Sequence, residues 1–169
     1  MGGFFGATSK RDCVLDVFFG TDYHSHLGTR RGGMACWSRV EGIQREIHNI
    51  ENSPFRTKFE QDAADMHGTA AIGCISDTDP QPLLIRSRLG VCAIAMIGII
   101  NNQEELAERF LNETHGHFEA MGGGRISQVE LLAALINQRG SFAEGIRYAQ
   151  QEIDGTASVL ILTDKGEII

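Results

Sequence analysis

Hydrophobic and polar residues alternate along the chain in runs typical of short strands and of helices. Short apolar runs predict strands, and longer stretches with apolar positions three or four apart predict helices. The expected strands cover residues 3–7, 32–37, 42–48, 70–75, 83–86, 91–98 and 156–163. The expected helices cover residues 10–26, 56–67, 102–112, 128–138 and 141–153. Because runs of strands are separated by runs of helices, the pattern predicts a layered α+β domain rather than a βαβ repeat.

Capping residues predict where several helices begin. Ser9 is expected to cap the first helix. Asn102 with Glu105, and Ser127 with Glu130, have the spacing of capping boxes. The apolar residues expected to form a broad buried face on the first helix are Val14, Leu15, Val17, Phe18 and Phe19.

Composition and charge narrow the class of protein. The chain has 169 residues, of which 42% are hydrophobic and 22% charged, as expected for one globular domain over residues 1–169. The net charge of -7 argues against a nucleic-acid surface. No apolar run approaches the roughly 20 residues that span a bilayer, and no signal peptide is evident, so a cytoplasmic location is expected. The chain ends on Ile168-Ile169 as a strand begins, which predicts an N-terminal piece of a longer polypeptide.

Cysteine and histidine residues offer only one weak candidate for a metal site. The cysteines are scattered without a C-x-x-C motif, and reduced, buried thiols are expected at Cys13, Cys36, Cys74 and Cys92. On a helix, His24 and His26 face different directions and would not chelate together. The loop-like His115-Gly116-His117 is a candidate for a transition metal, but the preferred interpretation has no metal and no cofactor. The run Gly122-Gly123-Gly124 lacks the Lys-Ser/Thr of a P-loop and is expected to be a loop.

The chain begins Met1-Gly2-Gly3-Phe4-Phe5-Gly6, an apolar, glycine-rich start. One class of hydrolase uses residue 2 as its nucleophile after removal of the initiator Met, and the freed α-amine is the base. Gly2 has no side chain that could attack a substrate. A retained Met1 would also place an amide where the free amine is required.

Further segments are similar in order and spacing to a known family. They are Thr29–Gly33, Ala71–Asp77, Gln81-Pro82, Ile94–Asn102 and Ser127–Leu132. They resemble the Q-H-R-G-Q, G-H-x-R-Y, Gln-Pro, L-A-H-N-G-x-L-x-N and S-D-S-E-x-L segments of amidophosphoribosyltransferase glutaminase domains. Those domains are class II glutamine amidotransferases of the N-terminal-nucleophile hydrolase superfamily. The resemblance implies a four-layer αββα sandwich.

The resemblance also implies which positions carried the catalytic groups. Gly2 stands at the nucleophile position, where the family has Cys. Ile97 stands at the position of the oxyanion-binding Asn, and its apolar side chain donates no hydrogen bond. Gly98 follows it and retains a backbone N–H that fits one donor of an oxyanion hole.

The substrate-binding positions are altered as well. Ser76 stands at the position of the Arg that binds the substrate carboxylate, and Gln128 at that of the Asp that binds the ammonium group. A serine hydroxyl replaces a bidentate cation there, so charge-assisted binding is lost. Arg31 lies in the retained Arg-Gly centre and is a candidate anion ligand, although Arg30 and Arg31 are also explained as solvated charges.

Three hypotheses for function follow. The preferred one is a glutaminase-like N-terminal domain of an amidophosphoribosyltransferase-like protein, with a degenerate site that lacks the Cys nucleophile. The second is a working domain that converts glutamine to glutamate plus ammonia, whose natural Cys at position 2 was replaced. The third is a structural or interaction module without a ligand. The expected partners are L-glutamine or a related small molecule, a missing C-terminal phosphoribosyltransferase-like domain, and further copies in a homo-oligomer.

Overall fold

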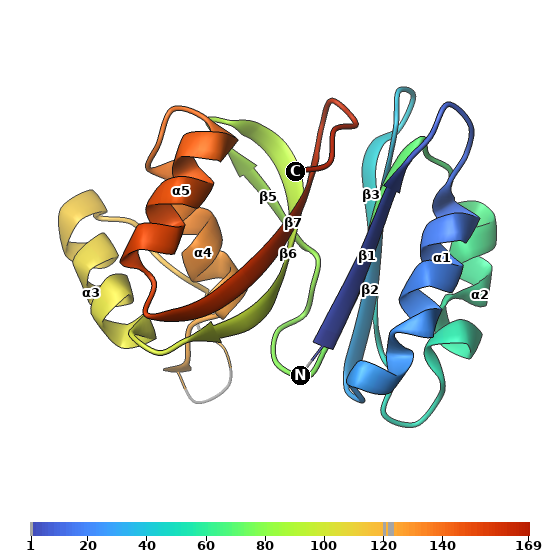
Figure 1. Cartoon of the computed structure of the whole chain (residues 1–169), viewed down its shortest axis with the longest axis horizontal. Helices are drawn as coiled ribbons and strands as arrows, with labels where there is room; N and C mark the ends of the chain where they lie inside the picture. Colours follow the sequence, from blue (N-terminus) through green and yellow to red (C-terminus); the bar gives the residue numbers. More distant parts are fainter. Residues whose placement is uncertain (1, 120, 122–123) are drawn as a thin grey trace. The chain divides into compact units, whose positions relative to one another are not determined.

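The structure is a computed structural model that describes residues 2–119, 121 and 124–169. Met1 and the predicted loop residues Gly122 and Gly123 lie outside the described residues. The chain divides into two compact units (Figure 1). The first unit comprises residues 1–86, 90–97 and 159–169, and the second comprises residues 87–89 and 98–158. Each unit is described by itself.

An antiparallel four-stranded sheet, ordered β1-β4-β2-β3, forms the centre of the first unit. Its strands are β1 (Gly2–Thr8), β2 (Arg31–Ser38), β3 (Gly42–Asn49) and β4 (Ala70–Ser76). Helices α1 (Val14–Tyr23) and α2 (Phe55–Asp65) cover one face of this sheet, and the 3₁₀ helix η1 (Ser25–Leu27) follows α1 (Figure 1).

A second sheet has the order β5-β6-β7. Its strands are β5 (Leu83–Ser87), β6 (Gly90–Ile100) and β7 (Gly155–Thr163). After β7 the chain turns back, and Ile161 and Ile169 exchange two backbone hydrogen bonds of 2.9 Å. The predicted start of a strand at Ile168-Ile169 is therefore present only as an isolated bridge between Leu162 and Ile168.

Two apolar clusters lie on the two faces of the four-stranded sheet, because neighbouring residues of a strand point to opposite faces. On β2, Met34 and Cys36 pack in the cluster under α1 and α2, which includes the stacked rings of Phe55 and Phe59. On the same strand, Ala35 points the other way. It belongs to the cluster of Ala35, Ala70, Ile72, Ala93 and Leu162, which joins the two sheets within the first unit.

Helices α3 (Gln103–Thr114), α4 (Gln128–Asn137) and α5 (Phe142–Glu152) make up most of the second unit. Helix α4 packs against both α3 and α5. The buried apolar residues of α4 are Val129, Leu131, Leu132, Ala133, Leu135 and Ile136. With this many buried positions, α4 is the central helix of the group.

The first helix differs from its prediction at both ends and on one face. It begins at Val14, because the Asp12 carboxylate accepts the Val14 N–H at 3.0 Å, and the Ser9 hydroxyl accepts only the Arg11 N–H. It ends at Tyr23 rather than near residue 26. The prediction that Leu15 and Phe19 are buried is wrong, since each side chain is 54% exposed.

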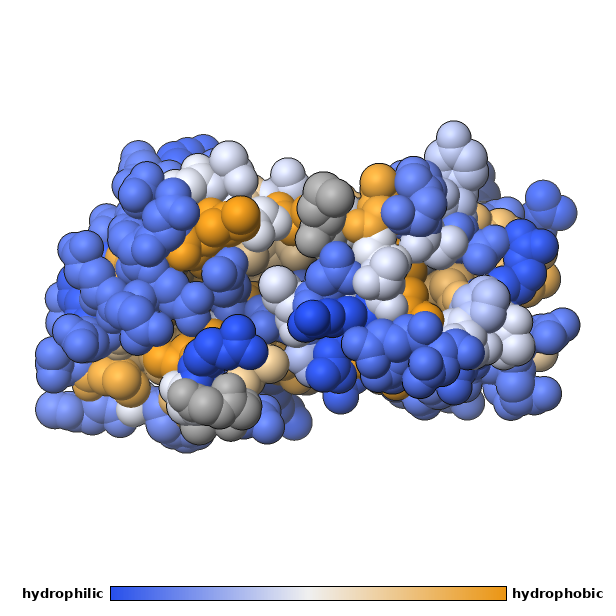
Figure 2. All heavy atoms as spheres, turned by 90° about the horizontal axis from the view of Figure 1, so that it is seen from below, coloured by the Kyte–Doolittle hydropathy of each residue, from blue (hydrophilic) through white to orange (hydrophobic). Residues whose placement is uncertain are grey.

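Large apolar side chains are also exposed elsewhere on the described surface. The remaining ones are Tyr23, Val40, Ile99, Leu111 and Ile169. On the face seen in Figure 2, hydrophilic residues predominate and apolar residues appear in separate patches. Scattered exposure of this kind is normal for a folded protein. Among the described residues, no helix is both long enough and apolar enough to cross a bilayer.

The two predicted capping boxes have different outcomes. The Ser127 hydroxyl accepts the Glu130 N–H at 3.3 Å, so the Ser127 half of this box is confirmed, whereas the Glu130 carboxylate accepts the N–H of Glu119. The predicted cap by Asn102 is wrong. Its side chain instead bonds the carbonyl oxygen of Glu152 and the N–H of Asp154, both at 2.9 Å. Asn102 therefore ties the start of α3 to the end of α5.

Ser127→Ala should lower the free energy of unfolding by about 1 kcal/mol, because it leaves an N–H at the start of α4 without its acceptor. Urea denaturation measures this loss. Ser9→Ala is the matched control, since its hydroxyl caps no helix. It should change stability by less than about 0.5 kcal/mol. Equal losses in both variants would contradict the assigned role of Ser127.

Candidate functional site

Gly2, Ser76 and Arg31 form one cross-strand row in the four-stranded sheet. Ser76 on β4 lies opposite Gly2 on one side and opposite Arg31 on the other. Directly opposed residues of an antiparallel pair point to the same face. That face is the one with Ala35 and Ile72, which packs toward the second sheet within the first unit. The fold thus brings three of the sequence-predicted positions together.

The space at position 2 fits glycine. A Cβ atom built on Gly2 would overlap the backbone carbonyl oxygen of Ile75 and would lie 2.8 Å from Cδ1 of Ile97. Both atoms belong to the first unit. The Ile97 side chain can rotate away, but the Ile75 oxygen is held in the β4 backbone beside Gly3. The half-buried Ile97, from β6, is therefore a fourth predicted position that lies beside Gly2.

Ser76 forms hydrogen bonds inside the first unit. Its side chain is buried, and its hydroxyl oxygen accepts the Thr78 N–H at 3.2 Å and the Gln81 amide N–H at 3.4 Å. Gln81, which is only 2% exposed, also accepts the Met96 N–H at 2.6 Å. The Ser76 hydroxyl thus anchors the loop after β4, and it carries no charge that would attract a carboxylate.

Arg31 supplies the cation of this row. Its side chain is half-buried, and among the described residues it forms no hydrogen bond or ion pair. The neighbouring Arg30 lies 4.0 Å from Glu51, and both side chains are exposed. Asp77 accepts the N–H of Thr29 at 2.7 Å, and this bond lowers the pKa of Asp77. Arg31 is therefore the group of the row best suited to an anionic ligand.

The remaining two predicted positions belong to the second unit. Gly98 is exposed, and a Cβ built on it would overlap the backbone carbonyl oxygen of Thr156. The Gln128 side chain accepts the Ile100 N–H at 3.2 Å. Gln128 thus connects the first turn of α4 to the end of β6.

The cysteines supply no substitute nucleophile. Cys13, Cys36, Cys74 and Cys92 are free and buried, as predicted. Burial raises the pKa of Cys36 to about 12 and that of Cys92 to about 11, and it also raises the pKa of Cys13 and Cys74. Since the thiolate is the nucleophile, these groups are unreactive near neutral pH.

The folded chain should therefore resist a thiol reagent such as a maleimide at about pH 8, where an unperturbed cysteine reacts readily. Unfolding in guanidinium should make all four cysteines reactive. Mass spectrometry counts the labels in each state. Rapid labelling of one cysteine in the folded chain would contradict the burial of that thiol.

The candidate histidine pairs gather no metal ligands in the part of the chain that the structure describes. Nδ1 of His24 lies 2.8 Å from the Gly20 oxygen, and Nδ1 of His26 lies 2.9 Å from the Tyr23 oxygen. His115 and His117 are exposed, and no third ligand joins them among residues 2–119, 121 and 124–169. A different group, formed by Glu46, His48 and Asp62, brings three ligand atoms together, and sequence reasoning did not anticipate it.

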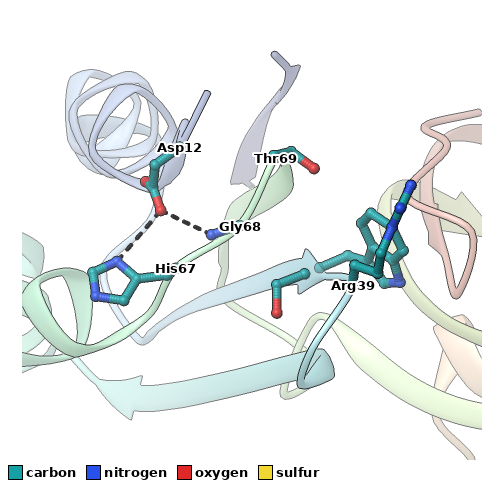
Figure 3. A pocket seen from close by; sticks show the side chains of 7 residues that line it. Asp12, Arg39, His67, Gly68 and Thr69 are labelled. Carbon is teal, nitrogen blue, oxygen red and sulfur yellow. Dashed lines mark hydrogen bonds and ion pairs between the residues drawn. The ribbon is translucent and has the colours of Figure 1, made fainter. Parts of the chain in front are cut away.

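Two hollows of about 420 and 540 Å³ share Asp12 and His67. In Figure 3, Asp12 points toward His67 and Gly68, with a 3.3 Å ion pair to the former and a 3.0 Å hydrogen bond to the latter. These residues adjoin the end of the sheet where Thr8 pairs with Ala70. Gly2 is at the opposite end of β1, so the hollows are separate from the cross-strand row.

Comparison with known proteins finds similarity in three-dimensional structure. No protein-family model matches the sequence, and no curated protein matches it. Among the solved structures that match, two cover 97% of the chain with TM-scores of 0.80. One is the glutamine phosphoribosylpyrophosphate (PRPP) amidotransferase of B. subtilis in complex with ADP and GMP, at 23% identity. The other is an allosteric regulatory enzyme of purine biosynthesis, at 22% identity.

The chain has the fold of a glutamine amidotransferase domain. The predicted α+β class is thereby confirmed, with two antiparallel sheets and helices as in the amidotransferase structures. The chain spans 35% and 36% of the lengths of the two matching chains. At this identity the comparison establishes the amidotransferase fold, whereas the chemistry depends on the residues described above.

Proposed function

We propose that this chain is a glutaminase-fold domain that does not hydrolyse glutamine. The observation that carries the proposal is the packing at position 2, where a Cβ would overlap the Ile75 carbonyl oxygen and crowd Ile97. A Cys side chain extends one atom beyond Cβ. Since even the Cβ lacks room, the backbone around Gly2 is suited to glycine and not to a nucleophile.

The other positions support the same proposal. Removal of one oxyanion-hole donor alone costs about two to three powers of ten in rate, and Ile97 offers no such donor. Ser76 forms hydrogen bonds to its own loop and carries no charge. Gln128 accepts a backbone N–H of β6. Each of these side chains has a structural role that fits a domain without hydrolytic activity.

The hypothesis of a working amidotransferase with a replaced Cys receives less support. It requires Cys at position 2 to fit against Ile75, and it requires a neutral Ser76 to hold a substrate carboxylate. Arg31 does support a remaining function in binding, since the residue is half-buried and a guanidinium is a strong ligand for carboxylates. We therefore include a small carboxylate ligand, with L-glutamine as the first compound to test, in the proposal.

The two matching chains are each nearly three times as long as this one, since it covers 35% and 36% of them. This ratio supports a longer protein in which the present domain precedes a phosphoribosyltransferase-like domain. Packing on that domain, and association of copies into a homo-oligomer, are roles that need no hydrolysis. Both roles belong to the proposal.

Isotope-labelled glutamine and calorimetry test the proposal together. The chain should release no labelled glutamate above a buffer blank. Calorimetry should detect glutamine binding, and Arg31→Ala should weaken it at least about tenfold, as expected for a lost charge-assisted hydrogen bond. Release of glutamate would overturn the absence of hydrolysis. If the unsubstituted chain does not bind glutamine, the proposed carboxylate ligand is refuted, and the hypothesis of a structural module without a ligand remains.

A further inference from the structure

Glu46, His48 and Asp62 bring together two carboxylates and an imidazole at the outer edge of the first unit. One ligand atom from each residue lies within 4.8 Å of the other two. Nε2 of His48 is 2.6 Å from Oδ2 of Asp62. The group is far from Gly2, because β3 and β1 are the opposite edge strands of the four-stranded sheet.

Regular secondary structure accounts for this convergence. Glu46 and His48 are two residues apart on β3, so both point to the same face of the sheet. Glu46 lies opposite Met34, whose side chain packs in the cluster under α1 and α2. Asp62 on α2 is three residues after the buried Phe59, which places both on one side of that helix.

The imidazole is held in place but remains open to solvent. The His48 ring meets the Phe59 ring edge-on, with centroids 4.7 Å apart and an interplanar angle of 74°. The side chains of His48 and Asp62 are 34% and 22% exposed, and Glu46 is exposed. An ion can therefore reach the three ligand atoms without a rearrangement of the core.

The charge around the group favours a cation. Among the described residues, no Lys or Arg forms an ion pair with Glu46 or Asp62. Within the described part of the chain, no Lys or Arg nitrogen therefore lies within 4.0 Å of either carboxylate. Zinc bonds of about 2.0–2.2 Å place tetrahedral ligand atoms about 3.4 Å apart. An entering ion would widen the 2.6 Å separation between His48 Nε2 and Asp62 Oδ2 and draw the exposed Glu46 carboxylate inward, and all three side chains are partly or fully exposed.

We propose that Glu46, His48 and Asp62 bind one divalent transition-metal ion of the Zn²⁺ type, with water in the remaining position. Imidazole nitrogen selects Zn²⁺-like ions over Mg²⁺, which prefers oxygen ligands and retains its water. The ion joins the edge strand β3 to helix α2. Because the ion binds only the folded chain, the melting temperature of the chain rises as the concentration of the ion increases.

Zn²⁺ titrated into the chelator-treated chain and followed by calorimetry tests this site. We expect one saturable site, and Mg²⁺ at equal concentration should not displace the ion. His48→Ala should weaken binding at least about tenfold. Glu46→Gln is the second variant, since an exposed side chain is replaced by one of the same size and the fold is retained. It should also weaken binding and reduce the Zn²⁺-dependent rise in melting temperature.

The matched controls are other histidines of the chain. His67 pairs with Asp12 at 3.3 Å but has no third ligand among the described residues (Figure 3). His67→Ala, and the double variant His115→Ala with His117→Ala, should leave Zn²⁺ affinity within about twofold of the parent. Absence of saturable binding, an unchanged affinity in Glu46→Gln, or equal losses in the controls would overturn the site.

Discussion

Gly2→Cys, with Met1 removed, should not restore glutamine hydrolysis. The variant supplies both the thiol and the free α-amine that an N-terminal nucleophile requires. However, its Cβ must displace the Ile75 carbonyl from β4 and push aside the Ile97 side chain. The thiol is then held without an oxyanion donor at Ile97 and beside a neutral Ser76. Glutamate release should therefore stay at the uncatalysed background.

Adding the family's other catalytic residues one at a time separates the steric cause of the missing hydrolysis from the electrostatic cause. Adding Ile97→Asn removes one of the two obstacles and supplies a donor, and adding Ser76→Arg restores the cation. We expect little activity after these steps, because the Ile75 oxygen still opposes the new Cβ. Maleimide labelling reports whether the thiol introduced at position 2 is accessible, and circular dichroism reports whether each variant folds. Substantial turnover by the folded Gly2→Cys chain would refute a site closed by packing.

Phe59→Ala should lower the free energy of unfolding by about 3–5 kcal/mol. The Phe59 side chain is fully buried, and its ring stacks on that of Phe55 at a centroid distance of 4.3 Å. It also supports the imidazole of His48. Truncation leaves a cavity between α2 and the sheet that the surrounding backbone cannot fill. Chemical denaturation measures the loss of stability.

Phe19→Ala is the matched control for this truncation. It removes the same ring from α1, but the Phe19 side chain is 54% exposed and its ring contacts are with the edge of Phe18 and the Arg56 guanidinium. Its cost should be below about 1 kcal/mol. Similar losses for the two phenylalanines would show that the cluster under α1 and α2 does not hold the fold together.

The strands could be predicted closely because their signal is local. Segments such as 32–37 and 70–75 are apolar and bounded by turn formers, and each matches a strand to within one residue at either end. The start of α1 could not be predicted in this way. Asp12 binds the distant Gly68 N–H as well as that of Val14, and this tertiary contact places the helix start beyond Ser9. Asn102 was misassigned for the same reason, because its partners are near residue 153.

The candidate site was only partly accessible from sequence. The substituted positions were identified by resemblance, and the cross-strand row Gly2–Ser76–Arg31 places three of them together. The lack of room at position 2 depends on a backbone oxygen, which no sequence pattern reveals. In the metal candidate, Glu46 and His48 alternate along an expected strand and could have been noticed. Asp62 comes from a helix, and only the fold brings it to them.

The two edges of the four-stranded sheet have different chemistry. An edge strand presents unpaired backbone groups to any polypeptide that can extend the sheet, and charged side chains oppose such growth. The edge strand β3 carries Arg45 and Glu46, whereas the residues of β1, Gly2–Thr8, include no charge. Side-chain charge therefore resists strand addition at β3, whereas β1 has no charged side chain to do so, and an added charge on β1 should make the isolated chain less prone to polymerise.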